Sequence, residues 1–178
     1  MGNDHTTQPH ESDDRAFRFR SGAVVRAGWL AGDLPFLTRS LRFLLRAPAD
    51  DLRAEFGLDA GDVGVLAVVD TNPGVTQNDL AASLVLKKSA VTRVVQRLEK
   101  RGVLIRRRST EDRRANRLTL TPEGVRLAVA VRKAMTARHD TWFQDIAPAD
   151  RAVFFDVLFR LVDHLAATVP PGEGGDED

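Results

Sequence analysis

The chemistry most open to this sequence is the binding of a polyanion, because its basic residues are concentrated in one stretch. Residues 87–126 contain 13 lysines and arginines but only four aspartates and glutamates, so this stretch has a net charge of +9. The whole chain has a net charge of +1, which leaves −8 for the remaining residues. Such an asymmetry aims one face at a polyanion such as nucleic acid. The alternative at this point is a basic face that is simply solvated.

Other reactive groups are scarce. The chain has no cysteine, which excludes disulfides, thiolate metal sites and cysteine nucleophiles. It has no Gly-rich phosphate loop, no Gly-x-Ser-x-Gly elbow and no His-Glu-x-x-His motif, so we predict that it is not an enzyme. His139 and His164 each stand beside an aspartate, so a metal site is one possibility. However, residues adjacent in sequence do not share a helix face, which argues against a common set of metal ligands. We therefore interpret both as surface or core histidines, and expect no metal and no cofactor.

The composition is that of a globular protein, with 43% hydrophobic and 29% charged residues. No apolar run reaches the roughly 18 residues that a membrane span needs, so we expect no membrane partner. The N-terminal residues lack the basic start and apolar stretch of a secretory signal, which favours a cytoplasmic location. We expect one domain over residues 17–169, flanked by polar, acidic, disordered tails at 1–16 and 170–178.

The pattern before the basic stretch predicts two helices. Leucines recur at helical spacing over residues 33–56, namely Leu34, Leu37, Leu41, Leu44 and Leu45. Pro48 interrupts this pattern, so we expect a break or a kink there. Residues 22–32 are apolar but rich in glycine, and either extend this helix or form an arm that packs on a partner. A second helix is expected over residues 60–71, with Asp59 as its N-cap.

Two shorter helices and a hairpin follow. Thr76 is placed to cap a short helix, with Asp79 in the position of a capping box. The next helix, residues 87–101, should end at Gly102 and turn four apolar side chains inward: Val91, Val94, Val95 and Leu98. Strand-like runs at 103–105 and 117–120 flank a charged segment, which predicts a β-hairpin with a long basic tip. This order of elements predicts a winged helix-turn-helix, whose second helix fits the DNA major groove.

The C-terminal part predicts two more helices. Thr121 is a good N-cap with Pro122 at the first helical position, and this helix should run to about residue 145. After a break at residues 146–148, a last helix should reach about Val169. Together these helices carry more apolar surface than a small helix-turn-helix core needs, so we expect them to dimerise. We interpret Trp29, Trp142 and Phe143 as core or interface residues rather than as a ligand cage.

Residues 76–124 resemble the MarR (multiple antibiotic resistance regulator) family. The matching runs are Asn78-Asp79-Leu80-Ala81, Val91-Thr92-Arg93, Leu98-Glu99-Lys100-Arg101-Gly102, Asp112-Arg113-Arg114 and Leu118-Thr119-Leu120-Thr121. Each run alone is weak, but their order and spacing are specific, and the resemblance extends over about residues 33–168. It implies a mainly α fold with a small β-hairpin wing and N- and C-terminal dimerisation helices. The winged core would be 59–121, and helices 33–56 and 122–169 would form a homodimer on a palindromic site.

The resemblance also implies which residues read DNA. The recognition helix would be 87–101, with Ser89, Thr92 and Arg93 in the groove and with Lys88 and Gln96 in support. Lys87 stands where the family often has a capping residue, so it either leaves the helix start frayed or contacts phosphate. Arg114 resembles the wing arginine and would be positioned by Asp112 for the minor groove. Arg97 and Arg113 complete the predicted contacts.

Many members of this family bind small aromatic acids between the dimerisation helices and the winged lobe. The resemblance therefore suggests Phe36, Arg39 and Phe43 as an aromatic wall with a partner for a carboxylate. The predicted function is that of a homodimeric, sequence-specific regulator, more specifically a repressor released by a small phenolic or aromatic acid. Two alternatives stay open on the same fold: a DNA-binding protein without sequence preference, and a protein-interaction module.

Overall fold

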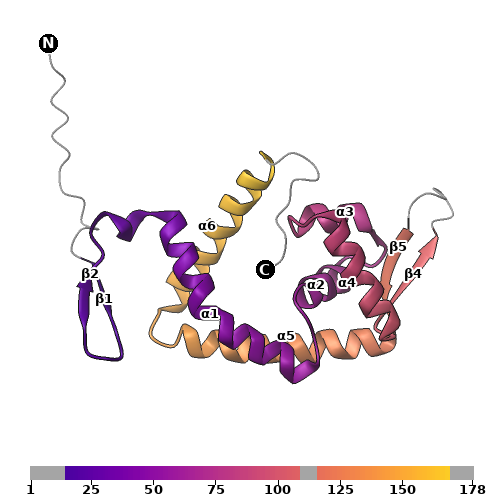
Figure 1. Ribbon diagram of the computed structural model, residues 1–178, viewed down its shortest axis with the longest axis horizontal. Coiled ribbons are helices and arrows are strands. Elements are labelled where there is room, and N and C mark those ends of the chain that lie inside the picture. The colour runs from indigo at the N-terminus through magenta and orange to yellow at the C-terminus, as the bar shows by residue number, and fades with distance from the viewer. Residues whose placement is uncertain (1–14, 109–115, 169–178) are drawn as a thin grey trace, which may run out of the picture. The chain divides into compact units, whose positions relative to one another are not determined.

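The computed structural model describes residues 15–108 and 116–168, and the chain forms two compact units, residues 1–50 and 51–178 (Figure 1). Most of the predicted tails, and the tip of the predicted hairpin with Asp112, Arg113 and Arg114, lie outside the described residues. Ala16 does not belong to a disordered tail, because it begins the first strand.

The first unit contains a hairpin, a short 3-10 helix and most of one long helix. Strands β1 (Ala16–Arg18) and β2 (Val24–Arg26) pair antiparallel, with Phe17 opposite Val25. The 3-10 helix spans Gly28–Gly32, and α1 spans Leu34–Phe56. The suggestion that residues 22–32 extend the first helix is therefore wrong. A separate helix begins after Asp33, whose carboxylate accepts the Phe36 N–H at 2.8 Å. Whether the hairpin packs on a partner stays a prediction.

A break at Pro48 is wrong, since α1 continues through this residue to Phe56, whereas the alternative of a kink stays a prediction. A proline inside a helix removes one backbone donor, here the one that would reach the carbonyl of residue 44. Leucine, alanine and arginine, which are strong helix formers, dominate both flanks of Pro48. The helix therefore continues past Pro48 although this hydrogen bond is missing.

The second unit holds the predicted winged helix-turn-helix. Its elements in order are α2 (Asp62–Thr71), β3 (Val75–Thr76), α3 (Gln77–Ser83), α4 (Lys88–Lys100), β4 (Leu104–Arg108), β5 (Asn116–Leu120), α5 (Pro122–Trp142) and α6 (Pro148–Ala166). The sheet has the order β3-β5-β4, with both pairs antiparallel. Strand β3 was not predicted, because two residues are too short to show alternation. It joins the wing to the start of α3.

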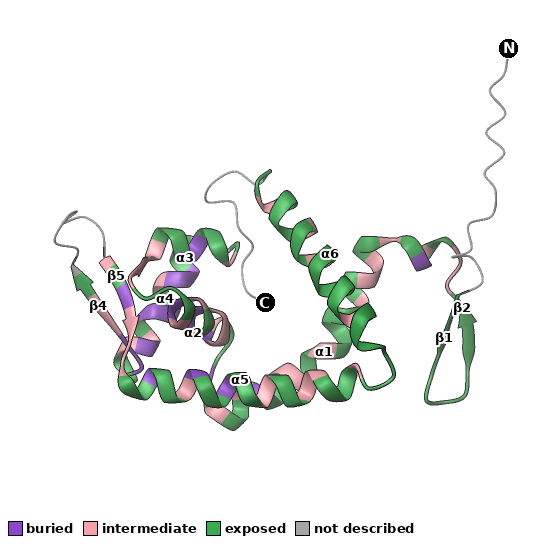
Figure 2. Cartoon of the chain, turned by 180° about the vertical axis from the view of Figure 1, so that it is seen from behind, coloured by how far each residue is buried: buried purple, intermediate pink, exposed green. Residues whose placement is uncertain are grey.

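Buried apolar side chains gather in this unit, as the purple segments of α2, α3, α4 and β5 in Figure 2 show. The largest fully buried ones are Leu66, Leu80, Leu98, Leu104, Leu118, Val65, Val69, Val91, Val95 and Val103. They come from three helices and the wing, so burial fixes the recognition helix and the wing against one common core.

Helix capping follows the sequence at two sites and departs from it at a third. The Thr76 hydroxyl accepts the Asp79 N–H, and the Thr121 hydroxyl accepts the Gly124 N–H at 3.0 Å, as predicted. The predicted N-cap at Asp59 is wrong, because α2 begins later, after Gly61 in the left-handed conformation. Asp62 reverses the expected bond: its carboxylate accepts the Asp59 N–H at 2.9 Å.

The C-terminal helices expose much apolar surface. Helix α5 ends at Trp142, three residues before the predicted end. None of residues 148–166 in α6 is buried, and α6 appears green or pink throughout in Figure 2. Phe143 packs on Phe154 and Phe155, with ring centroids 6.1 and 5.4 Å apart. Within the described part of the chain, no helix is both long and apolar enough to cross a membrane.

Candidate nucleic-acid interface

Helix α4 divides into an apolar face and a polar face. Its buried residues are Ala90, Val91, Val94, Val95 and Leu98, as the helical spacing predicted. Ser89, Arg93, Gln96 and Lys100 are exposed and recur at intervals of three or four residues, so they form one stripe along the other side. This polar stripe places the predicted groove residues Ser89 and Arg93 together with Gln96. Lys88 is also exposed, at the start of the helix.

Thr92 lies at the border of the polar stripe and is half-buried. Its hydroxyl donates to the Lys88 carbonyl at 2.8 Å and accepts from the Gln77 amide at 3.4 Å. Thr92 thus connects α4 to Gln77, the first residue of α3. Both hydrogen bonds of its hydroxyl are made within the two helices of the motif. A DNA contact by Thr92 stays a prediction.

The start of α4 has no side-chain cap among the described residues. Lys87 occupies the N-cap position with extended backbone and makes no side-chain capping bond. The sequence predicted this loss of a cap. The first backbone N–H groups of a helix without a cap are ready donors for an anion, and the helix dipole adds to this preference.

The turn between α3 and α4 contains a strained residue. Val85 has a φ of +53°, in the left-handed region that β-branched residues avoid. The Val85 and Leu86 N–H groups donate to the carbonyls of Ala82 and Ala81, which closes the C-terminus of α3. The turn therefore fixes the angle between the two helices at a cost in backbone strain.

The wing separates its arginines onto two faces. Arg106 faces the helices, and its guanidinium bonds the Glu99 carboxylate on α4 at 2.8 Å. Arg107 pairs across the strands with Arg117, and both side chains are exposed. Arg117 also donates to the Gly74 carbonyl at 3.4 Å. Sequence reasoning did not predict that Arg107 lies opposite Arg117, because this pairing depends on the register of the hairpin.

Arg97, which was predicted to contact DNA, makes several contacts within the protein. Its guanidinium bonds the Asp62 carboxylate, with Nε–Oδ1 and Nη2–Oδ1 distances of 3.1 and 2.5 Å. It also donates to the Ala60 carbonyl at 3.0 Å and forms an ion pair with Asp59 at 3.1 Å. Asp62 is 2% exposed, so Arg97 supplies the charge partner of a buried carboxylate. A direct DNA contact by Arg97 stays untested.

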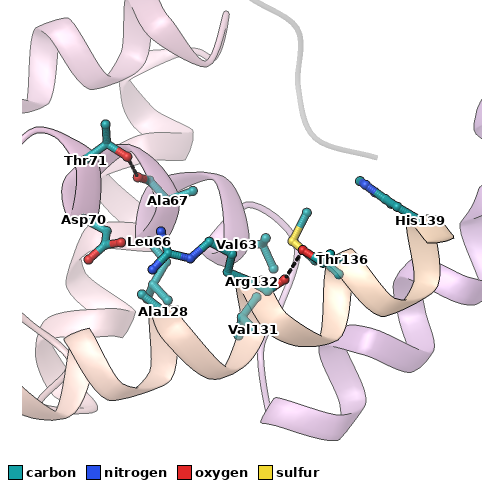
Figure 3. A pocket seen from close by; sticks show the side chains of 11 residues that line it. Val63, Leu66, Ala67, Asp70, Thr71, Ala128, Val131, Arg132, Thr136 and His139 are labelled. Atoms are coloured by element: carbon teal, nitrogen blue, oxygen red, sulfur yellow. Dashed lines mark hydrogen bonds between the residues drawn. The ribbon is translucent and has the colours of Figure 1, made fainter. Parts of the chain in front are cut away.

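A second feature of this unit is a cavity of about 230 Å³ between α2 and α5 (Figure 3). Its apolar wall is made by Val63, Leu66, Ala67, Ala128, Val131 and Met135. Its polar rim contains Asp70, Thr71, Arg132, Thr136 and His139. Both threonine hydroxyls donate to carbonyls of their own helices at 3.0 Å. The side chains of Asp70, Arg132 and His139 therefore give the rim its charged and titratable groups.

The predicted ligand residues on α1 do not line this cavity. Phe36 is half-buried and its ring packs against Phe17 at a centroid distance of 6.1 Å. Arg39 and Phe43 are exposed, and Phe43 is 77% exposed. Their role in ligand binding stays a prediction, and the cavity adds residues that the helical pattern alone did not indicate.

The histidine considered as a metal ligand lies among aromatic rings. His139 packs against Trp142 and Phe155 at centroid distances of 5.2 and 6.3 Å. Among the described residues, no three histidine or acidic side chains gather in a way that could hold a metal ion. Trp142 and Phe143 belong to the same aromatic group, whereas Trp29 is largely exposed.

Comparisons with known proteins agree with this arrangement. A model of the MarR family matches residues 56–115. A proposed transcriptional regulatory protein for the hcr operon of Thauera aromatica is 31% identical over 135 residues, which cover 75% of this chain and 81% of that protein. The transcriptional repressor MdtR of Bacillus subtilis is 34% identical over 86 residues, or 47% of this chain and 56% of that protein.

A solved structure extends the similarity to the fold. CouR from Rhodococcus jostii, bound to p-coumaroyl-CoA, superposes with a TM-score of 0.64 at 25% identity, over 72% of this chain and 91% of that one. The predicted mainly helical winged fold, with its hairpin wing and terminal helices, is confirmed. The chain belongs to the MarR family and is a DNA-binding transcriptional regulator.

Proposed function

We propose that this protein is a homodimeric repressor that recognises one palindromic operator. The observation that carries the proposal is the polar stripe of α4, which stands opposite a fully buried face. Arg93 and Gln96 have the geometry and the donors to read base edges in a major groove. Lys88, Lys100 and Arg107 are exposed nearby on α4 and the wing and are suited to phosphate contacts. The predicted wing contacts of Asp112, Arg113 and Arg114 belong to the same proposal.

The homodimer is supported by α6. Its exposed apolar residues are Val153, Phe154, Phe155, Val157, Phe159, Val162 and Leu165. A monomer rarely leaves so large an apolar surface in water, so we infer that a second copy covers it. A symmetric pair would present two recognition helices, and two such helices match a palindrome.

The release of DNA by a small ligand is supported by the cavity between α2 and α5. Its volume lies below the roughly 300–1,000 Å³ of sites for drug-sized ligands, which favours a compound with a single ring. Arg132 on the rim is suited to a carboxylate, and His139 to a phenolic hydroxyl. The similar CouR binds an aromatic acyl group as its coenzyme A thioester. Because the cavity is small and Arg132 is suited to a carboxylate, we propose a free aromatic acid as the effector class. Phe36, Arg39 and Phe43 remain candidates for a further part of that site.

The repressor proposal is tested by binding to selected DNA. A duplex would be selected from a randomised pool, and its affinity compared by fluorescence anisotropy with that of a scrambled duplex. A specific regulator prefers the selected duplex by at least about 1,000-fold. Replacing Arg93 with Gln should reduce this preference by about 1–3 kcal/mol per half-site.

The matched control is Arg126→Gln, which removes one arginine from the same basic stretch. Arg126 lies on α5 and forms an ion pair with Glu123, so its replacement should leave the preference unchanged. Equal binding of the wild-type protein to both duplexes would favour a DNA-coating protein without sequence preference. No binding to either duplex would favour the protein-interaction module.

A further inference from the structure

Two arginines at the C-terminal end of α4 form hydrogen bonds with the segment that joins α1 to α2. Arg97 binds the Ala60 carbonyl and the Asp62 carboxylate, as described above. One helical turn later, Arg101 donates from Nη1 to the Gly57 carbonyl at 2.6 Å and from Nη2 to the Phe56 carbonyl at 2.8 Å. We call residues 56–62 the connector. The connector and both arginines belong to the second unit, residues 51–178.

Arg101 supplies hydrogen-bond donors at the end of α1. Gly57 has a φ of +60°, and its N–H donates to the Ala54 carbonyl while the Leu58 N–H donates to the Arg53 carbonyl. This pattern satisfies the hydrogen bonding of two of the last carbonyls of the helix. The Phe56 and Gly57 carbonyls lie beyond it, and the planar fork of Arg101 reaches both at once.

The start of α2 depends on Arg97 in a similar way. The Asp62 carboxylate is buried and accepts both the Asp59 N–H and the Arg97 guanidinium. A buried carboxylate without a charged partner is strongly unfavourable, so Arg97 and the fold of the connector stabilise each other. The connector is thereby fixed to α4 at both of its ends.

We propose that Arg97 and Arg101 form a clamp that positions the recognition helix, and that they act through the connector rather than through DNA. This proposal rests on the proposed function, because it concerns how the polar stripe of α4 is oriented toward the DNA groove. Replacing a clamp arginine should misalign that stripe and lower the affinity for the selected duplex. The affinity for scrambled DNA, which depends on charge and not on alignment, should stay the same.

The clamp differs measurably from a pair of phosphate contacts. A phosphate contact lowers affinity for all sequences when it is removed, and it reduces the salt dependence, −d log K/d log [salt], by about 0.9 for each contact. A lysine keeps the charge and satisfies a phosphate, but its single ammonium does not reproduce the fork that two acceptors require. The charge-conserving variants Arg97→Lys and Arg101→Lys therefore separate the two roles.

The experiment measures the affinity of each variant for the selected and the scrambled duplex over a range of salt concentrations. We expect Arg97→Lys and Asp62→Asn each to weaken binding of the selected duplex by about 5- to 150-fold, the range that one lost base contact spans. Scrambled binding and both salt slopes should match wild type. Because Arg97 acts through Asp62, the double variant should lose little more than either single variant. Lys100→Gln is the matched control, and it should weaken both duplexes and reduce the slope.

Full affinity of Arg97→Lys for the selected duplex would overturn the clamp, as would a lower salt slope for Arg97→Gln. A loss of folded protein would lower the apparent affinity for both duplexes equally, so the unchanged scrambled binding distinguishes positioning from instability. Arg101→Lys, whose site holds no buried charge, repeats the test if Asp62→Asn does not fold.

A DNA-independent measurement covers the case in which the wild-type protein prefers no sequence. Hydrogen exchange at the Asp59 amide, which Asp62 accepts, should accelerate in Arg97→Lys and Asp62→Asn but not in Lys100→Gln. Acceleration without any operator preference would keep the clamp and refute the proposed function. Unchanged exchange in both clamp variants would refute the clamp itself.

Discussion

Replacing Gly124 with Ala should destabilise the protein, because the site has no room for a methyl group. A Cβ atom at Gly124 would lie 2.0 Å from the Val103 carbonyl oxygen and 3.1 Å from the Leu120 Cβ. Real Cβ atoms keep about 3.0 Å or more, so the backbone of Val103 or the first turn of α5 must move by about 1 Å. Neither is the flexible end of a side chain, so the movement is costly.

The magnitude follows from two destabilising terms and one stabilising term. Overpacking a tight site costs about 1–3 kcal/mol. The Val103 carbonyl accepts the Thr121 N–H at 3.0 Å, and moving it weakens a hydrogen bond worth about 1 kcal/mol. Alanine gains about 1 kcal/mol over glycine in helix propensity. We therefore expect the free energy of unfolding to fall by about 1–3 kcal/mol.

Urea unfolding followed by circular dichroism measures this change, with all variants at one protomer concentration because the stability of a dimer would depend on that concentration. Gly64→Ala on α2 is the matched control: its nearest contact is the Leu84 Cδ2 at 3.1 Å, a side-chain end that can rotate. That variant should stay within about 1 kcal/mol of wild type. If Gly124→Ala were as stable as Gly64→Ala, the argument from the Val103 carbonyl would be refuted.

Three further predictions concern the turn, the dimer and the cavity. Val85→Gly should raise the unfolding free energy by about 0.5–1 kcal/mol, since a left-handed non-glycine residue costs about 1–2 kcal/mol, whereas Val85→Ala should gain nothing because it keeps that strain. Phe159→Glu, at a residue that is 73% exposed on α6, should shift the protein toward monomer in sedimentation velocity, and an unchanged dimer would place the interface elsewhere. A panel of hydroxybenzoates and hydroxycinnamates should release the selected duplex, and Arg132→Gln should weaken this effect about 10- to 100-fold by removing a charge-assisted hydrogen bond. Equal release from both proteins would exclude Arg132 as the carboxylate partner.

Local rules were sufficient for most of the fold. Apolar side chains at helical spacing located α4, and the hydroxyls of Thr76 and Thr121 marked two helix starts, because both patterns depend on a few neighbouring residues. Pro48 does not break α1, because the preference of a single residue does not outweigh strong helix formers on both sides. Strand β3 was not predicted from the sequence, because it is defined by its pairing with β5, which brings Val75 opposite Leu118.

The site was less predictable because charged side chains of one type have different partners. Arg93 and Arg97 are both arginines on α4, one turn apart, and the sequence suggested DNA contacts for both. Asp62, 35 residues before Arg97, makes the difference, since its buried carboxylate binds one of them. No local pattern shows such a partner.

The two adjacent arginines of β4 also differ in their partners. Arg106 is occupied by Glu99 on the helix-facing side, whereas Arg107 is exposed on the outer side of the wing opposite Arg117. A side chain whose countercharge comes from the protein has less to gain from phosphate. We therefore expect Arg107→Gln to reduce the salt slope of binding by about 2 for a dimer, or about 0.9 for each of two contacts.

Arg106→Gln should leave the slope unchanged and lower only the preference for the selected duplex, because the Glu99 contact links the wing to α4. The two variants carry the same change of charge at adjacent positions, so net charge cannot explain a difference between them. Equal slopes for both variants would mean that DNA responds to the total charge of the basic stretch, and that the internal partners of its arginines do not decide which of them bind phosphate.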